Sequence, residues 1–162
     1  MRALGRELRQ DCRVYFTGGA TALLVGWRAS AVAIDLKIVP DGEAFAALAR
    51  LKNQLDISLE LASPDHFIPE LRGWESRSPF VAREGKVSFY HLDPYSQALS
   101  KIERGFDQDL RDVREMVSRG LVEPARAWKL FREIEPDLIR YPALDPDSFR
   151  RAVGEFFELP PE

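Results

Sequence analysis

Two adjacent glycines and one aspartate are the residues of this 162-residue sequence most suited to chemistry. Gly18 and Gly19 directly follow a short apolar run, and Asp35 lies inside a second one, between Ile34 and Leu36. Adjacent glycines let the backbone turn tightly into a helix whose exposed N–H groups can hold a phosphate. A carboxylate in an apolar strand costs several kcal/mol unless it is paired or binds a cation. The pattern therefore indicates a phosphate-binding turn beside a cation-binding acid, although Gly-Gly alone is more often ordinary turn chemistry.

Three elements must position these residues. Residues 13–16 predict a first strand, and residues 33–39 predict a second strand that carries Asp35. The segment between them predicts a helix that begins after Gly19 and buries Ala22, Leu23 and Trp27. The order is strand, glycine turn, helix, strand, which would bring Asp35 back toward the glycines.

The remaining elements of the first part predict helices packed on a sheet. A helix over 43–53 carries Phe45, Leu48, Ala49 and Leu51 at helical spacing. Residues 55–62 alternate as in a half-buried strand, with leucine and isoleucine on one face and Asp56, Ser58 and Glu60 on the other. The other predicted elements are a helix over 3–10 and a β-hairpin over 80–92, turning at Glu84–Gly85 with its return strand near the sheet edge.

From Asp93 the pattern changes to helices. Asp93 and Pro94 predict an N-cap followed by proline at the first helical position. Further helical segments begin at prolines and cover 124–135, 136–141 and 146–157. We therefore expect an α/β core over residues 1–93 and a helical C-terminal extension over residues 94–162 that packs on the core.

Composition excludes several classes of protein. The formal net charge is −3, whereas nucleic-acid-binding domains are usually strongly basic, and no DNA-specific motif is present. No apolar run approaches the roughly 20 residues that span a bilayer, so we expect a cytoplasmic protein. Cys12 has no second cysteine to pair with, and His66 and His91 lack the spacing of metal ligands.

The glycine–aspartate pattern resembles that of the nucleotidyltransferase superfamily. Gly18 and Gly19, thirteen intervening residues, and then Ala33-Ile34-Asp35-Leu36 match two glycines followed by an acid-x-acid pair on the next strand. The closest type is the small prokaryotic minimal nucleotidyltransferase and AbiEii toxin group, which includes a nucleotidyltransferase-like family of unknown function. The resemblance implies an α+β fold, a mixed sheet flanked by helices. It covers about residues 13–113 and departs from the pattern where Ala33 occupies the first acidic position.

The same resemblance implies a set of site residues. Mg²⁺ or Mn²⁺ would be held by Asp35 with a third acid of the superfamily, for which we place Asp56 ahead of Glu60. Gly18, Gly19 and Arg28 would bind the phosphates of a nucleoside triphosphate. With Ala33 in the pattern, the metal would be weakly held.

A second motif supports the resemblance. Lys101-x-x-Arg104, followed by Asp109-x-x-Asp112, is similar to a lysine and acid arrangement that follows the catalytic core of AbiEii-type proteins. By that resemblance Lys101 faces phosphate as a catalytic cation, and Asp109 orients it. Without the upstream glycines and Asp35, surface helices with weak charge pairs would be the preferred interpretation.

These residues leave three functions open. The first is metal-dependent transfer of a nucleoside monophosphate from a triphosphate to a hydroxyl of RNA or protein, weakened by Ala33. The second is an inactive nucleotidyltransferase-fold protein that acts by binding, such as one component of a toxin–antitoxin pair. The third is an unrelated α+β domain with coincidental glycines. Ala33 could be natural or introduced by an engineer, and the sequence does not distinguish these origins.

Overall fold

The computed structural model describes residues 1–158, and the last four residues lie outside the described part. The chain is an α+β protein with a mixed five-stranded sheet, which confirms the predicted fold class. It divides into two compact units. The first unit comprises Met1–Ser63 and Ser78–Leu92, and the second comprises Pro64–Arg77 and the helices that follow Asp93. The segment Pro64–Arg77 therefore packs with the helices of the second unit, although it precedes residue 93 in the sequence.

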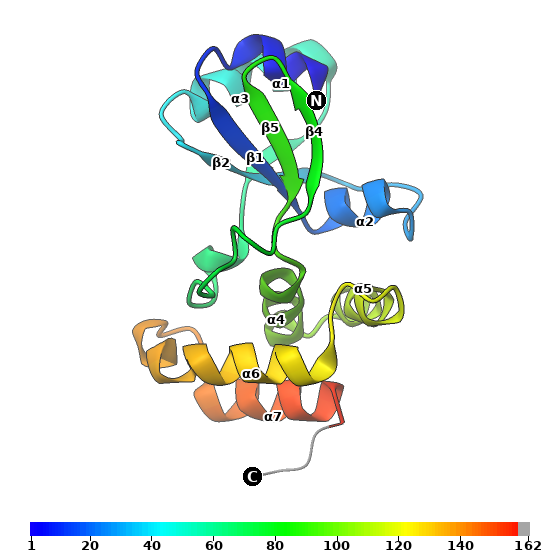
Figure 1. Ribbon diagram of the computed structural model, residues 1–162, viewed down its shortest axis with the longest axis vertical. Coiled ribbons are helices and arrows are strands. Elements are labelled where there is room, and N and C mark those ends of the chain that lie inside the picture. The colour runs from blue at the N-terminus through cyan, green and yellow to red at the C-terminus, as the bar shows by residue number, and fades with distance from the viewer. Residues whose placement is uncertain (159–162) are drawn as a thin grey trace. The chain divides into compact units, whose positions relative to one another are not determined.

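The first unit contains the sheet, in the strand order β3-β2-β1-β5-β4 (Figure 1). β1 is antiparallel to β2 and parallel to β5, β2 is parallel to β3, and β4 is antiparallel to β5. In chain order its elements are α1 (Arg2–Glu7), β1 (Cys12–Thr17), α2 (Gly19–Val25), β2 (Ile34–Val39), α3 (Ala44–Leu55), β3 (Leu59–Leu61), β4 (Phe80–Glu84) and β5 (Val87–His91).

One face of the sheet forms the core of this unit. Alternate positions of the central strands, such as Val14, Leu36 and Phe89, pack with apolar residues from α1 and α3. Figure 1 shows α1 and α3 on the same side of the strands. Because alternate strand residues point to opposite faces, the residues between these core positions face the other side. Asp35 is one of them, which explains how an acid sits in an apolar strand.

Several predicted details of the first unit are wrong. Leu23 and Phe45 are exposed, at 39% and 76%, because the buried faces of their helices are formed by smaller neighbours such as Ala22 and Ala44. The return strand of the hairpin, β5, is the second strand from the sheet edge, between β1 and the edge strand β4. The hairpin itself is confirmed.

The second unit is helical. Asp93 caps its first helix as predicted, since its carboxylate accepts a hydrogen bond from the Tyr95 backbone N–H. α4 contacts each of the other α-helices of the unit as well as the short turn η1. The elements are η1 (Pro64–His66), α4 (Pro94–Arg104), α5 (Asp107–Ser118), α6 (Pro124–Ile134), η2 (Glu135–Arg140) and α7 (Pro146–Phe156), with η1 and η2 being 3₁₀ turns. Within residues 1–158, no helix has the length and apolar character needed to cross a membrane.

Candidate functional site

The Gly18–Gly19 turn and Asp35 lie together in the first unit. Gly18 has φ +57°, a backbone conformation that favours glycine, and it caps the start of α2. A Cβ atom placed on Gly18 would lie 3.6 Å from Oδ2 of Asp35. A Cβ atom on Gly19 would lie 3.4 Å from Nη1 of Arg28. The structure therefore brings the glycine turn, the strand carboxylate and the guanidinium to one place, as the sequence predicts.

The register of the strands adds an acid beside Asp35. Thr17 of β1 pairs with Asp35 of β2, and Asp35 pairs with Glu60 of β3. Residues directly opposite one another on adjacent strands point to the same face of the sheet. Thr17, Asp35 and Glu60 therefore form a row across three strands, with Asp35 half-buried and Glu60 exposed. We call this row, with Gly18, the acidic sheet end.

Asp56 does not lie in this row. α3 continues to Leu55, and Asp56 is its C-cap, in the left-handed conformation with φ +51°. β3 begins only at Leu59, so the strand predicted from residue 55 is wrong in its first half. The alternation that predicted it is carried there by Leu55 and Ile57, which are exposed at 47% and 39%. The order of the two candidate acids is thereby reversed: Glu60, and not Asp56, is the acid in register with Asp35.

The acidic sheet end fits one divalent cation better than two. Carboxylate and hydroxyl oxygens are suitable ligands for Mg²⁺, which usually binds through one or two carboxylates with waters and substrate phosphates. Asp35 and Glu60 supply two carboxylates, and Ala33 supplies none. Within residues 1–158, no cluster of three or more His, Cys, Asp or Glu side chains has the geometry of a metal site. This donor set could hold one weakly bound ion that the triphosphate itself helps to coordinate.

A half-buried histidine, His91 of β5, contacts α2, the helix that follows the glycine turn. Thr21 of α2 donates a hydrogen bond through its hydroxyl to the carbonyl of Phe16, and its oxygen lies 3.3 Å from Nδ1 of His91. With the hydroxyl proton donated to Phe16, the tautomer of His91 that is protonated on Nδ1 completes this contact. Burial lowers the pKa of His91, which favours the neutral imidazole. The sequence pointed to neither side chain, since they are 70 residues apart.

Lys101 lies in the second unit, inside a buried network of charges. Its Nζ lies 2.9 Å from Oδ2 of Asp112 and 3.6 Å from Oδ1 of Asp109. Arg104 donates to the other oxygen of Asp109 at 3.1 Å. Asp112 has no exposed surface, and the side chain of Lys101 is 11% exposed. The Lys101 motif thus folds as a packed ion-pair network between α4 and α5, and the roles of Lys101 and Asp109 toward a nucleotide stay predictions.

The first unit has the architecture of a nucleotidyltransferase-like α+β protein: a mixed sheet flanked by helices, with a glycine turn beside an acidic strand. Residues 4–156 match the model of a family described as nucleotidyltransferase of unknown function (DUF6036), and the chain belongs to that family. The match confirms the predicted superfamily, while the AbiEii-like type stays a prediction. No curated protein and no solved structure matches the chain significantly.

Proposed function

We propose that this protein binds a nucleoside triphosphate with one Mg²⁺ (or Mn²⁺) at the acidic sheet end, and that it transfers the nucleoside monophosphate slowly to a hydroxyl of RNA or protein. The observation that carries the proposal is the position of the Asp35 carboxylate, 3.6 Å from where a Cβ of Gly18 would lie. Family membership supports the class of reaction. The finer activity rests on the chemistry of these residues.

Each residue of the acidic sheet end would have a distinct task. Asp35 and Glu60, which are in register on neighbouring strands, would hold the cation. When bound, that cation neutralises charge on the transferred phosphate. Gly18 leaves its backbone open to a phosphate because it has no side chain, and Arg28 would supply a planar cation for the phosphate oxygens. Together these groups would hold the triphosphate without a second metal ion.

Ala33 sets the expected rate. Active members of the superfamily hold two cations, and a two-metal site stabilises both the attacking and the leaving oxygen. Residue 33 lies immediately before β2 and offers only a methyl group. We therefore expect measurable binding of nucleotide with metal, and turnover that is slow or absent.

The test is a calorimetric titration of ATP with and without Mg²⁺. We expect Asp35→Asn to weaken Mg²⁺-dependent binding by about tenfold or more, because the substitution removes one of two cation ligands. Asp56→Asn is the matched control, since it makes the same chemical change at an exposed helix C-cap where asparagine tolerates the left-handed backbone. Absence of both nucleotide and Mg²⁺ binding at millimolar concentrations would overturn the proposal.

The second candidate function is binding without catalysis, for instance as one half of a toxin–antitoxin pair. The observation in its favour is Ala33, because the first acidic position of the motif is missing. The aromatic residues of the C-terminal helices add little to it, since Phe131 and Phe149 are buried and serve the core of their own unit. Ala33→Asp distinguishes the two functions. Transfer of a labelled nucleotide that appears only in Ala33→Asp would favour the unsubstituted chain being the binding form.

A further inference from the structure

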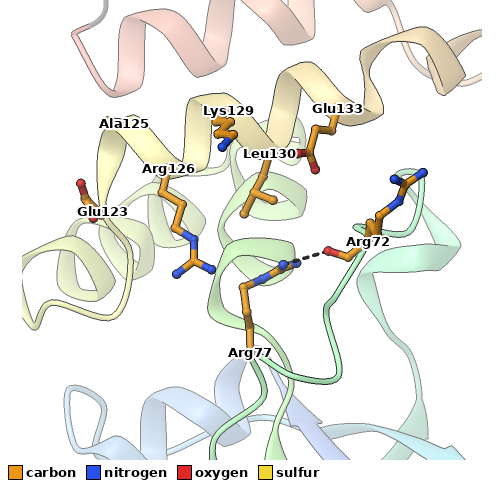
Figure 2. Close-up of a pocket in the computed structure, with 8 residues that line it drawn as sticks. All are labelled: Arg72, Arg77, Glu123, Ala125, Arg126, Lys129, Leu130 and Glu133. Atoms are coloured by element: carbon orange, nitrogen blue, oxygen red, sulfur yellow. Dashed lines mark hydrogen bonds between the residues drawn. The ribbon is translucent and has the colours of Figure 1, made fainter.

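The second unit contains a pocket of about 530 Å³ that the proposed nucleotidyl transfer does not use. It lies between α6 and the segment that precedes the hairpin, both of which belong to this unit (Figure 2). Its volume falls within the range of about 300–1,000 Å³ that is usual for small-molecule sites. The lining residues are Arg72, Arg77, Glu123, Ala125, Arg126, Lys129, Leu130 and Glu133. We call it the α6 pocket.

The α6 pocket is locally basic in a chain whose net charge is negative. Four of its lining side chains are cationic and two are anionic. Arg77 is neutralised by the buried Asp93, whose carboxylate accepts from both Nε and Nη2. Within the described part of the chain, Arg72, Arg126 and Lys129 form no ion pair. Unpaired cations that line a concave site favour an anionic ligand.

Two of the arginines are held in place before any ligand binds. Arg77 is 14% exposed and also donates through Nη1 to the backbone carbonyl of Arg72 at 2.8 Å. The guanidinium of Arg126 lies over the ring of Tyr95, 5.3 Å from its centroid. Stacking occupies the face of a guanidinium and leaves its N–H edges available, and those edges match phosphate oxygens in pairs. Figure 2 shows the side chains of Arg77 and Arg126 directed into the space below α6.

The other lining groups indicate more than a bare anion. Glu123 and Glu133 add hydrogen-bond acceptors to the lining, and both carboxylates would repel a ligand that is anionic throughout. Ala125 and Leu130 contribute apolar surface between them on α6. A ligand that satisfies this lining has a phosphate at one part and hydroxyl or amino donors at another.

We propose that the α6 pocket binds a small phosphate ester that carries hydroxyl or amino groups and has the size of a mononucleotide. Arg126 and Lys129, which form no ion pair among the described residues, receive the phosphate. The glutamates accept hydrogen bonds from the rest of the ligand. Cationic side chains contact the phosphate directly, so no divalent cation is needed for binding. The pocket is therefore a site separate from the acidic sheet end.

The experiment uses the full chain carrying Asp35→Asn, in EDTA, so that the acidic sheet end does not contribute. ADP, ribose 5-phosphate and pyrophosphate are titrated by calorimetry, and the amide NMR signals of the ¹⁵N-labelled chain locate the bound molecule. We expect ADP or ribose 5-phosphate to bind more tightly than pyrophosphate, with shifts at residues 72–77 and 123–133. The double variant Arg126→Gln/Lys129→Gln should lose about tenfold or more in affinity, since it removes both cations that make charge-assisted hydrogen bonds to the phosphate.

The matched control is Arg111→Gln/Arg151→Gln, which removes two exposed cations from α5 and α7, away from the pocket. An equal loss of affinity in this control would mean non-specific attraction and would overturn the proposal. If pyrophosphate bound as tightly as ADP, the pocket would recognise only the anionic group. That result would overturn the proposal that its ligand is a phosphate ester. A short single-stranded oligonucleotide that binds far more tightly than ADP would instead assign the surface to a nucleic-acid strand. Absence of binding by every probe at millimolar concentration would remove the pocket as a ligand site.

Discussion

The two charged motifs that resemble nucleotidyltransferases lie in different surroundings. Asp35 and Glu60 belong to a row at the end of the sheet, where Asp35 is half-buried and Glu60 is exposed. Lys101 and Asp112 are enclosed between α4 and α5. The Nζ atom of Lys101 lies 2.9 Å from Oδ2 of Asp112, and the Asp112 side chain has no exposed surface. Such a buried ion pair is needed for the stability of its own unit, because removing either charge leaves the other buried without compensation. One family-like motif therefore serves the fold, whereas the other lies where its carboxylates reach solvent.

The largest expected effect is on the buried pair. Lys101→Met should lower the free energy of unfolding by about 3–5 kcal/mol, because the Asp112 carboxylate would remain buried without its cation. Urea denaturation measures it, and Lys101→Arg, which keeps the charge, should lose less. Arg119→Met is the control at an exposed pair with Glu115 and should cost at most about 1 kcal/mol. If Lys101→Met were stable but no longer bound ATP, Lys101 would belong with the ligand site and the comparison would fail.

A smaller effect is expected at the glycine turn. Gly18→Ala should cost about 1–3 kcal/mol of stability, because residue 18 has φ +57°, and it should also weaken Mg²⁺-dependent ATP binding. Gly120→Ala is matched to it, since Gly120 has φ +74° and a Cβ there would meet nothing within 4 Å. Denaturation and calorimetry on both variants separate backbone strain from binding. We expect both variants to lose stability and only Gly18→Ala to lose binding; equal binding in the two variants would count against the site.

The smallest effect concerns His91, the half-buried histidine of the first unit. Burial lowers the pKa of His91, so as the pH falls below about 6.5 the unfolded chain takes up a proton before the folded chain does. The free energy of unfolding should therefore decrease from pH 7 downward until the lowered pKa is reached. His91→Gln should reduce this decrease, and His66→Gln, at an exposed position, should leave it unchanged. Denaturation curves at pH 7.5 and 5.5 measure both; the same slope in wild type and His91→Gln would contradict the prediction.

Much of the fold could be predicted from local patterns. A proline in the first turn marked the starts of α4, α6, η2 and α7, and glycine marked the turn of the hairpin. Predictions failed where a local pattern was compatible with both a strand and the end of a helix. Residues 55–58 alternate like a strand, yet α3 extends to Leu55 and Asp56 caps it, because the packing of Leu48 and Leu51 stabilises the helix up to its last turn.

The candidate site was predictable only in part. Gly18 and Asp35 could be found because the order strand, turn, helix, strand returns the chain to its starting edge, and Arg28 was indicated by the family resemblance alone. Glu60 ranked second because spacing along the chain does not reveal which residue of β3 pairs with Asp35. The contact between Thr21 and His91 left no sequence pattern, since the two residues are brought together only when β5 pairs with β1.

The sequence by itself determined the elements, their order, and the superfamily to which the glycine–acid spacing points. It could do so because helix caps, turns and apolar periodicity act over a few residues. Only the tertiary structure decided that Glu60 stands beside Asp35, that Lys101 is enclosed with Asp112, and that α6 and residues 72–77 line one basic pocket. Each of these depends on strand register or helix packing between distant segments, which is determined by burial of the whole core and not by any local stretch of the chain.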